Sequence, residues 1–152
     1  MTWEVIMSKV ADILASKSGP VVTIGENESV LNATRIMNEH KIGALVVTDG
    51  EGHVVGMFTE RDVLRRIVAE QKDPASTIVA VAMTSDVIVC EADMPLEDCR
   101  QLMRNRRIRH LPVVDSKGKL QGMVSIGDLN AQLANNHEIH IKYLSEYIHG
   151  RV

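Results

Sequence analysis

The feature that most constrains the fold of this chain is an internal repeat. Residues 42–62 align with residues 108–128 at a constant offset of 66 positions. So many identities in one register indicate a tandem duplication, and a duplication sets the architecture of the whole chain. The eight identical pairs are Ile42/Ile108, Leu45/Leu111, Val47/Val113, Asp49/Asp115, Gly52/Gly118, Gly56/Gly122, Met57/Met123 and Asp62/Asp128.

Each copy is predicted to follow the order strand, helix, strand, strand, helix. Short apolar runs rich in β-branched residues indicate the first strands, and apolar residues at helical spacing indicate the first helices. Turn sequences join the next two strands, and a second helix begins near Thr59 in one copy and near Ser125 in the other. The predicted strands are 21–24, 45–48 and 54–58 in the first copy and 87–90, 111–114 and 120–124 in the second.

One copy of this size buries little surface by itself. We therefore expect an α/β fold of the α+β type, in which two β-α-β-β-α repeats related by a pseudo-twofold axis pack into one compact module. The predicted boundaries are 8–72 for repeat 1, 77–134 for repeat 2 and 135–152 for a helical tail. In the tail, Ile141, Leu144 and Ile148, flanked by Tyr143 and Tyr147, have the spacing of a short amphipathic helix. That helix either folds back on its own module or packs on a second chain.

Composition argues against several classes of function. A formal net charge of −3 and only four aromatic residues disfavour nucleic-acid binding. No apolar run reaches the roughly 18 residues of a membrane span, and the N-terminus does not read as a leader, so we expect a cytoplasmic protein. Cys90 and Cys99 are predicted to be buried small hydrophobes. The pair His137 and His140 lacks a third ligand nearby, so no metal is expected.

Two segments carry a family resemblance. Gly56-Met-Phe-Thr-Glu-Arg-Asp62 and Gly122-Met-Val-Ser-Ile-Gly-Asp128 share a Gly-x-x-Thr/Ser-x-x-Asp motif. This motif resembles that of the cystathionine β-synthase (CBS) domain, and the tandem is similar to a CBS pair, also called a Bateman module. The resemblance covers residues 8–134 and implies a stand-alone regulatory module that binds adenine nucleotides and acts in signal transduction.

The residue types of the motif fit that implication. A Ser or Thr hydroxyl can cap a helix whose first backbone N–H groups can meet a phosphate. A carboxylate one turn further can accept hydrogen bonds from the two vicinal hydroxyls of a ribose. The alternative is structural, since an Asp in the first turn of a helix also stabilises the helix dipole.

The resemblance implies two clefts, each of which combines the motif of one repeat with strands of the other. In the Asp128 cleft, Ser125 and Asp128 would bind the ribose, while Arg109 and Arg61 would face the phosphate. The adenine slot of this cleft would be lined by Val21, Val22, Ile42, Gly43 and Ala44. The Asp62 cleft would use Thr59 and Asp62, with Val87, Ile88, Ile108, His110 and Pro112 around the base. Gly43 and Gly127 replace the two arginines there, so the Asp128 cleft is expected to be the better phosphate site.

Some alternatives stay open at this stage. Arg104 and Arg106 fit solvated positions near a helix C-terminus, and His110 fits a ligand contact or a structural histidine equally well. The leading hypothesis is a non-enzymatic sensor of adenine nucleotides, with AMP as the first candidate ligand and ATP, ADP or NAD(H) as the others. Its partners would be a second copy of the chain in a homodimer and a downstream protein that the sequence does not identify. The alternative is a structural or dimerisation module that binds a protein partner without a small ligand.

Overall fold

The computed structural model describes residues 9–17 and 19–148, except for the side chains of residues 137–140, 143 and 145–148. The chain divides into two compact units. Unit 1 consists of Met1–Gly19, Cys90–Val113 and Met123–Val152, and unit 2 consists of Pro20–Val89 and Val114–Gly122. A unit is therefore not the same as a sequence repeat, because the segment before the first predicted strand belongs to the unit that holds most of the second repeat.

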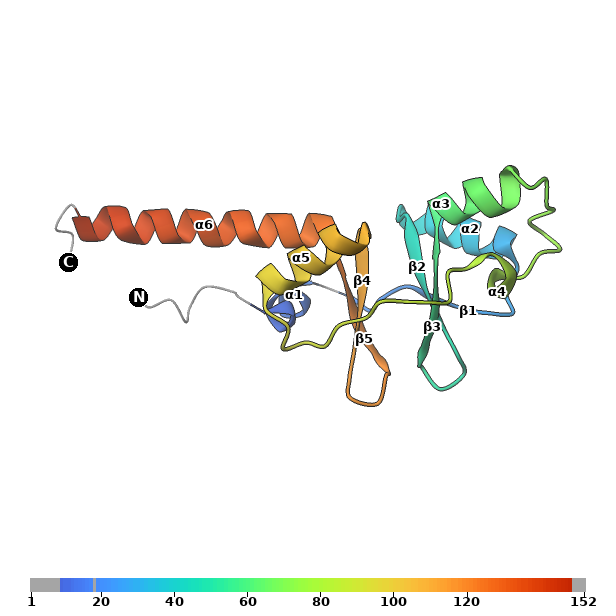
Figure 1. The fold of residues 1–152 in the computed structure, drawn as a ribbon, viewed down its shortest axis with the longest axis horizontal. Coiled ribbons are helices and arrows are strands. Elements are labelled where there is room, and N and C mark those ends of the chain that lie inside the picture. Colours follow the sequence, from blue (N-terminus) through green and yellow to red (C-terminus); the bar gives the residue numbers. More distant parts are fainter. Residues whose placement is uncertain (1–8, 18, 149–152) are drawn as a thin grey trace. The chain divides into compact units, whose positions relative to one another are not determined.

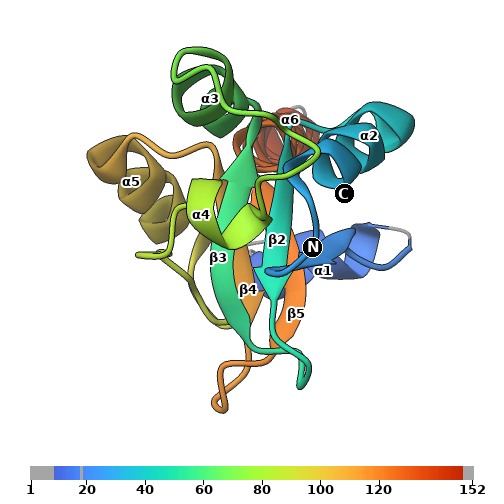
Figure 2. The ribbon, with the colours of Figure 1, turned by 90° about the vertical axis from the view of Figure 1, so that its right-hand side faces the viewer.

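Unit 2 is built on a three-stranded sheet of order β1-β2-β3. Strands β1 and β2 are parallel, and β2 and β3 are antiparallel, with Leu45 opposite Phe58. Helices α2 and α4 pack near the sheet (Figures 1 and 2), and both contribute to one apolar core with Leu45, Val47 and Phe58. The elements are β1 (Thr23–Gly25), α2 (Val30–His40), β2 (Ala44–Thr48), β3 (Val54–Thr59), α3 (Glu60–Asp62), the π-helix η2 (Val63–Val68) and α4 (Val79–Ala82).

Unit 1 contains most of the other elements. Helices α1 and α5 both contact the long helix α6, and β4 and β5 form a two-stranded sheet (Figure 1). Buried apolar side chains on α5 recur at helical spacing, at Leu96, Cys99 and Met103. The elements are α1 (Val10–Ser16), α5 (Leu96–Arg106), β4 (His110–Val114), β5 (Leu120–Ser125) and α6 (Ile126–Ile148).

The predicted repeat is visible in the local backbone of the two copies. Helices α2 and α5 both end in a left-handed residue, Lys41 with φ 55° and Arg107 with φ 54°, and these residues are 66 positions apart. The turns before β3 and β5 both contain a glycine with positive φ, Gly52 and Gly118, a conformation that glycine adopts without steric cost. The mixed helix and strand content confirms the predicted α+β fold class.

The predicted strand at 87–90 is wrong. This segment pairs with β4 only through an isolated parallel bridge between Cys90 and Val113, in which the Cys90 N–H donates to the Pro112 carbonyl at 3.0 Å. Pro112 occupies the position that Val46 holds in β2, and it has no N–H to donate. A proline at this position prevents the ladder from extending toward Ile88.

The helices also differ from the sequence prediction in three ways. Short helices α1 and α4, which precede β1 and the segment 87–90, were not predicted. The helix after Thr59 makes one α-helical turn and then continues as the π-helix η2. Helix α6 runs from Ile126 to Ile148 without a break at residue 134, so the expected separate tail helix is the second half of α6. The side chains of Tyr143, Tyr147 and Ile148 lie outside the described residues.

Candidate functional site

The motif of the second repeat forms a reciprocal cap at the start of α6. The Asp128 N–H donates to Ser125 Oγ at 3.0 Å, and the Ser125 N–H donates to Asp128 Oδ2 at 3.0 Å. Such a cap satisfies two backbone donors that a helix N-terminus otherwise leaves unpaired. It also fixes the direction of the carboxylate, while Oδ1 of Asp128 accepts no hydrogen bond from the described residues.

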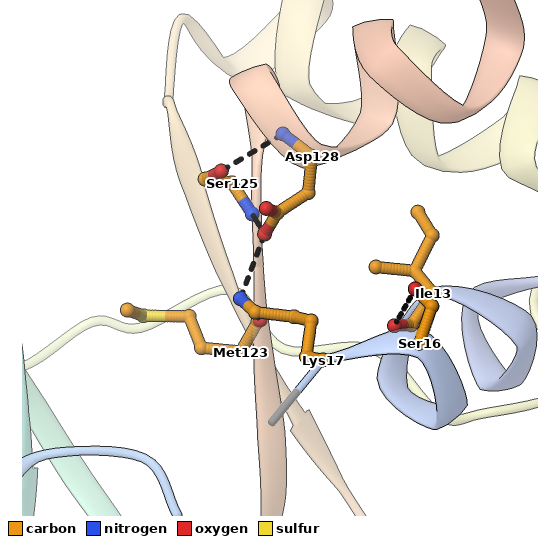
Figure 3. Close-up of polar contacts among 6 residues, drawn as sticks. All are labelled: Ile13, Ser16, Lys17, Met123, Ser125 and Asp128. Carbon is orange, nitrogen blue, oxygen red and sulfur yellow. Dashed lines mark hydrogen bonds and ion pairs between the residues drawn. The ribbon is translucent and has the colours of Figure 1, made fainter. Parts of the chain in front are cut away.

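A lysine from the end of α1 completes the surroundings of Asp128. Lys17 Nζ donates to Asp128 Oδ2 at 2.7 Å and to the Met123 carbonyl at 2.8 Å (Figure 3). Burial works to raise the pKa of Asp128, but the ammonium of Lys17 and the hydrogen bonds from Ser125 outweigh it and lower the pKa below its ordinary value. The carboxylate therefore stays ionised at neutral pH, so both of its oxygens act only as acceptors, which suits ligand hydroxyls.

Arg109 lies beside this motif. Its carbonyl accepts the N–H of Ile126, the first residue of α6, at 2.8 Å, so its backbone is anchored next to the Ser125–Asp128 cap. The Arg109 side chain is exposed. A guanidinium near the start of a helix adds a full positive charge to backbone N–H groups that already favour anions. Unit 1 thus places the capping hydroxyl and carboxylate next to the backbone of Arg109. A shared ligand site for these three residues stays a prediction.

The motif of the first repeat forms the equivalent cap in unit 2 with a different cation. The N–H and hydroxyl of Thr59 donate to Asp62 Oδ2 at 3.0 and 3.2 Å, and the Asp62 N–H donates to Thr59 Oγ1 at 3.3 Å. The other oxygen, Oδ1, lies 3.8 Å from Arg66 Nε, one turn further along the same helical segment. Asp62 is the more deeply buried of the two carboxylates, with 11% of its side chain exposed against 28% for Asp128.

Glu60 gives the first motif the opposite charge at the position that corresponds to Arg109. The backbone geometry is the same, since the Glu60 N–H donates to the Gly43 carbonyl at 3.0 Å, as Ile126 does to Arg109. Gly43 has no side chain, and the Glu60 carboxylate lies against it, 3.2 Å from where a Cβ would stand. One motif therefore has an arginine at this point, whereas the other has a carboxylate. The predicted inequality of the two motifs extends further than the arginine positions alone suggested.

The remaining predicted residues divide between the units. For the Asp128 cleft, Ser125, Asp128 and Arg109 belong to unit 1, and Val21, Val22, Ile42, Gly43, Ala44 and Arg61 belong to unit 2. For the Asp62 cleft, Thr59, Asp62, Val87 and Ile88 belong to unit 2, and Ile108, His110 and Pro112 belong to unit 1. Arg61 is exposed, while Ala44 and Pro112 are buried. That the residues of each set line one cleft stays a prediction.

Sequence reasoning missed the charged neighbours of both carboxylates, which are Lys17, Glu60 and Arg66. A signal existed for Arg66, which follows Asp62 at the i+4 spacing of helical ion pairs, whereas the corresponding position after Asp128 is Gln132. A weaker signal existed for Lys17. It lies in the segment 15–20, which is longer than its counterpart in the second repeat.

Neither cysteine joins these sites. Burial raises the pKa of Cys90 to about 12 and also raises the pKa of Cys99, so both thiols stay protonated, as buried hydrophobes do. Among the described residues, no group of three His, Cys, Asp or Glu side chains is placed to hold a metal ion. The side chains of His137 and His140 lie outside the described residues.

Unit 2 also has a hollow of about 370 Å³ at the carboxyl ends of β1 and β2. It contains none of the residues predicted for ligand binding. Three of its lining side chains are acidic, Glu26, Glu28 and Asp49, which makes the hollow unfavourable for a phosphate.

Comparison with known proteins identifies the family of this chain. The model of the CBS domain family matches the chain twice, at residues 10–69 and 76–135. The chain belongs to the CBS domain family. Both matches contain one Thr/Ser-x-x-Asp cap, so the two capped carboxylates are a repeated feature of this CBS pair.

Relatives of similar size support the assignment. A 17.7 kDa protein of Acidianus ambivalens without an assigned function is 36% identical over 143 residues, which cover 94% of this chain and 84% of that protein. A candidate signal-transduction protein with CBS domains from Burkholderia ambifaria MC40-6 is 39% identical, with a TM-score of 0.77 over 82% of this chain and 93% of its own. The CBS domain pair of protein MJ0100, solved in complex with 5′-methylthioadenosine and S-adenosyl-L-methionine, is 29% identical, with a TM-score of 0.74 over 84% and 96% of the two chains.

No helix within the described part of the chain is long and apolar enough to cross a membrane.

Proposed function

We propose that this CBS pair is a regulatory module that binds an adenosine-containing ligand and transmits the occupancy of its sites to a partner protein. The observation that carries the proposal is the capped carboxylate of Asp128. Its Oδ2 is held by the cap, while Oδ1 accepts no hydrogen bond from the part of the chain that the structure describes and can take a ligand hydroxyl. The ligands of the MJ0100 pair support an adenosine moiety. Ligand binding can shift such a module only through different affinities for two of its arrangements.

We propose further that the two motifs prefer different ligands. Arg109 beside the Asp128 motif favours a phosphate, so AMP is the first candidate there, with ADP, ATP and NAD(H) as alternatives. Glu60 beside the Asp62 motif repels a phosphate, so this motif favours an uncharged or positively charged adenosine derivative. Val21, Val22, Ile42, Gly43, Ala44 and Arg61 are proposed to complete the Asp128 site, and Val87, Ile88, Ile108, His110 and Pro112 to complete the Asp62 site.

Calorimetric titration with AMP and with 5′-methylthioadenosine tests this proposal. We expect Asp128→Asn to abolish the AMP site and to leave binding of 5′-methylthioadenosine at the other site. Asp62→Asn should have the opposite effect. Asparagine is nearly isosteric with aspartate and keeps one oxygen acceptor for the cap, so the matched pair separates loss of the carboxylate from loss of the helix start. Loss of AMP binding through Asp62→Asn alone would show that the assignment is inverted.

The alternative proposal is a dimerisation module that binds no small ligand. Ile141 and Leu144 on α6 have 53% and 40% of their surfaces exposed, and Leu64 and Val68 on η2 have 63% and 62% exposed. Apolar surface of this kind is often covered by a second copy in a symmetric homodimer. A homodimer is compatible with ligand binding, so the deciding result is the titration. A dimer that shows no heat and no thermal shift with any adenosine derivative favours the structural role.

A further inference from the structure

Lys17 donates to the same oxygen of Asp128 that accepts the helix cap. Oδ2 of Asp128 accepts from the Ser125 N–H and from Lys17 Nζ, which together use the two lone pairs of that oxygen. A ribose that donates its two vicinal hydroxyls to both carboxylate oxygens needs one of those lone pairs. The Ser125 bond belongs to the helix cap, so Lys17 is the partner that can leave.

The second bond of Lys17 takes the place that a backbone bridge has in the other repeat. Its ammonium donates to the Met123 carbonyl at 2.8 Å. In unit 2 the corresponding carbonyl, that of Met57, accepts the backbone N–H of Thr84 at 2.9 Å within an antiparallel bridge. A backbone bridge in one unit is thus replaced by a lysine side chain in the other. A side chain that is 41% exposed can leave its partners without breaking a strand.

Release of Lys17 from Asp128 would free the segment that connects the two units, because Lys17 lies at the start of that segment. Lys17 follows α1, and the chain passes from unit 1 to unit 2 between Gly19 and Pro20. Asp128 therefore ties down the segment that leads into the other unit. At Asp62 the neighbouring cation is Arg66, which lies on the same helical segment as that carboxylate and donates to the Met83 carbonyl at 2.8 Å. Arg66 is 3.8 Å from Oδ1 and leaves Oδ2 to the cap, so it does not take the cap oxygen as Lys17 does at Asp128.

From these contacts we propose that Lys17 is a built-in competitor for the ribose at Asp128. It holds the segment after α1 against unit 1 while the site is empty, and it releases that segment when a ribose takes both carboxylate oxygens. The inference rests on the proposed function, since it assumes that Asp128 binds a ribose. In addition, it makes Lys17 a residue that tunes the affinity of the Asp128 site for a ribose. Through Lys17, occupancy of that site would act on the segment that connects the two units.

The test is calorimetric titration with adenosine, which has no phosphate and so isolates the ribose contact. All proteins in the test carry Asp62→Asn, which removes the site proposed for uncharged derivatives and leaves the Asp128 site. Lys17→Met keeps the length of the side chain and removes the ammonium. Exposed ion pairs of this kind correspond to a change of about two- to fivefold in an equilibrium, so Lys17→Met should bind adenosine two- to fivefold more tightly than the protein that retains Lys17. Lys72→Met, which removes an exposed lysine outside both motifs, is the control for net charge.

A second ligand makes the test specific. 2′-Deoxyadenosine has only one of the two hydroxyls and can use Oδ1 alone, so Lys17→Met should leave its affinity unchanged. The gain for adenosine should also disappear in the Asp128→Asn background. A structural effect of Lys17 would change both ligands alike.

The outcomes separate the two proposals. Equal or weaker adenosine binding by Lys17→Met overturns the competition and leaves the proposed function standing. An equal gain in the Lys72→Met control, or an equal gain for 2′-deoxyadenosine, also overturns it. Absence of adenosine binding both with Lys17 present and with Lys17→Met overturns the competition, and absence of AMP binding as well overturns the proposed function.

Discussion

Replacement of Arg109 by alanine is the sharpest test of the charge difference between the two motifs. The backbone of Arg109 is anchored by the Ile126 N–H at the start of α6, so truncation of the side chain should leave the cap intact. The motif around Asp128 then resembles the one around Asp62, where Gly43 stands at the same position.

The size of the effect follows from the hydrogen bond that the Arg109 guanidinium would donate to a phosphate. Hydrogen bonds to charged groups contribute about 1.5–3 kcal/mol, and solvent screens an exposed guanidinium such as that of Arg109, so the lower end applies. A loss of about 1.4 kcal/mol weakens binding tenfold. We therefore expect AMP to bind about tenfold more weakly to Arg109→Ala, while the affinity for adenosine changes by less than about twofold, within the range for removal of a surface charge.

Isothermal titration of both ligands measures this directly. Arg104→Ala is the matched control, because Arg104 is an exposed arginine in the last turn of α5 and belongs to the same basic cluster. The reasoning fails if Arg109→Ala weakens adenosine as much as AMP, which would indicate a damaged site. It also fails if Arg104→Ala weakens AMP equally, because the effect would then come from overall charge.

Three further predictions concern stability and assembly. Gly56→Ala should destabilise the protein by about 1–3 kcal/mol in chemical denaturation, because the Cβ of the new alanine would collide with Met83 and lie 3.1 Å from a backbone oxygen. Gly50→Ala is the control and should leave the free energy of unfolding nearly unchanged, because the space around Gly50 is open. Because the folded-state pKa of Asp128 lies below its ordinary value of 3.8, its contribution to stability is complete above that pH and is lost as the pH falls through the folded-state value. Wild-type protein should therefore lose more stability between pH 6 and pH 3 than Asp128→Asn, and equal losses would contradict the role of the ion pair. Light scattering should give about twice the chain mass of 16.8 kDa for the homodimer, and removal of residues after Ala134 should weaken association; a full-length monomer at micromolar concentration would refute the dimer.

The local features of the fold could be predicted from the sequence because short-range chemistry determines them. The 66-residue offset of the repeat reappears in the left-handed helix ends at Lys41 and Arg107. The Thr/Ser-x-x-Asp spacing predicted a hydroxyl and a carboxylate in the first turn of a helix, and both caps are present. These features depend on residues within a few positions of one another, so neighbours in sequence are sufficient to define them.

Features that depend on distant parts of the chain could not be predicted in this way. The missing strand before Cys90 depends on Pro112, which belongs to another segment and withholds a hydrogen-bond donor. The contact between Lys17 and Asp128 joins residues 111 positions apart. No spacing rule covers such a pair, because a side chain reaches any partner that tertiary packing brings near it.

The sequence by itself therefore determined the duplication, the α+β class and the identity of the two capped carboxylates. Tertiary structure alone decided the charge that a distant segment brings to a carboxylate. Lys17 at the end of α1 binds Asp128, whereas Arg66 lies one helical turn from Asp62 at a spacing that the sequence already shows. The physical reason is that capping is a local hydrogen-bonding pattern, whereas the electrostatic environment of a site is the sum of charges that folding assembles from separate segments.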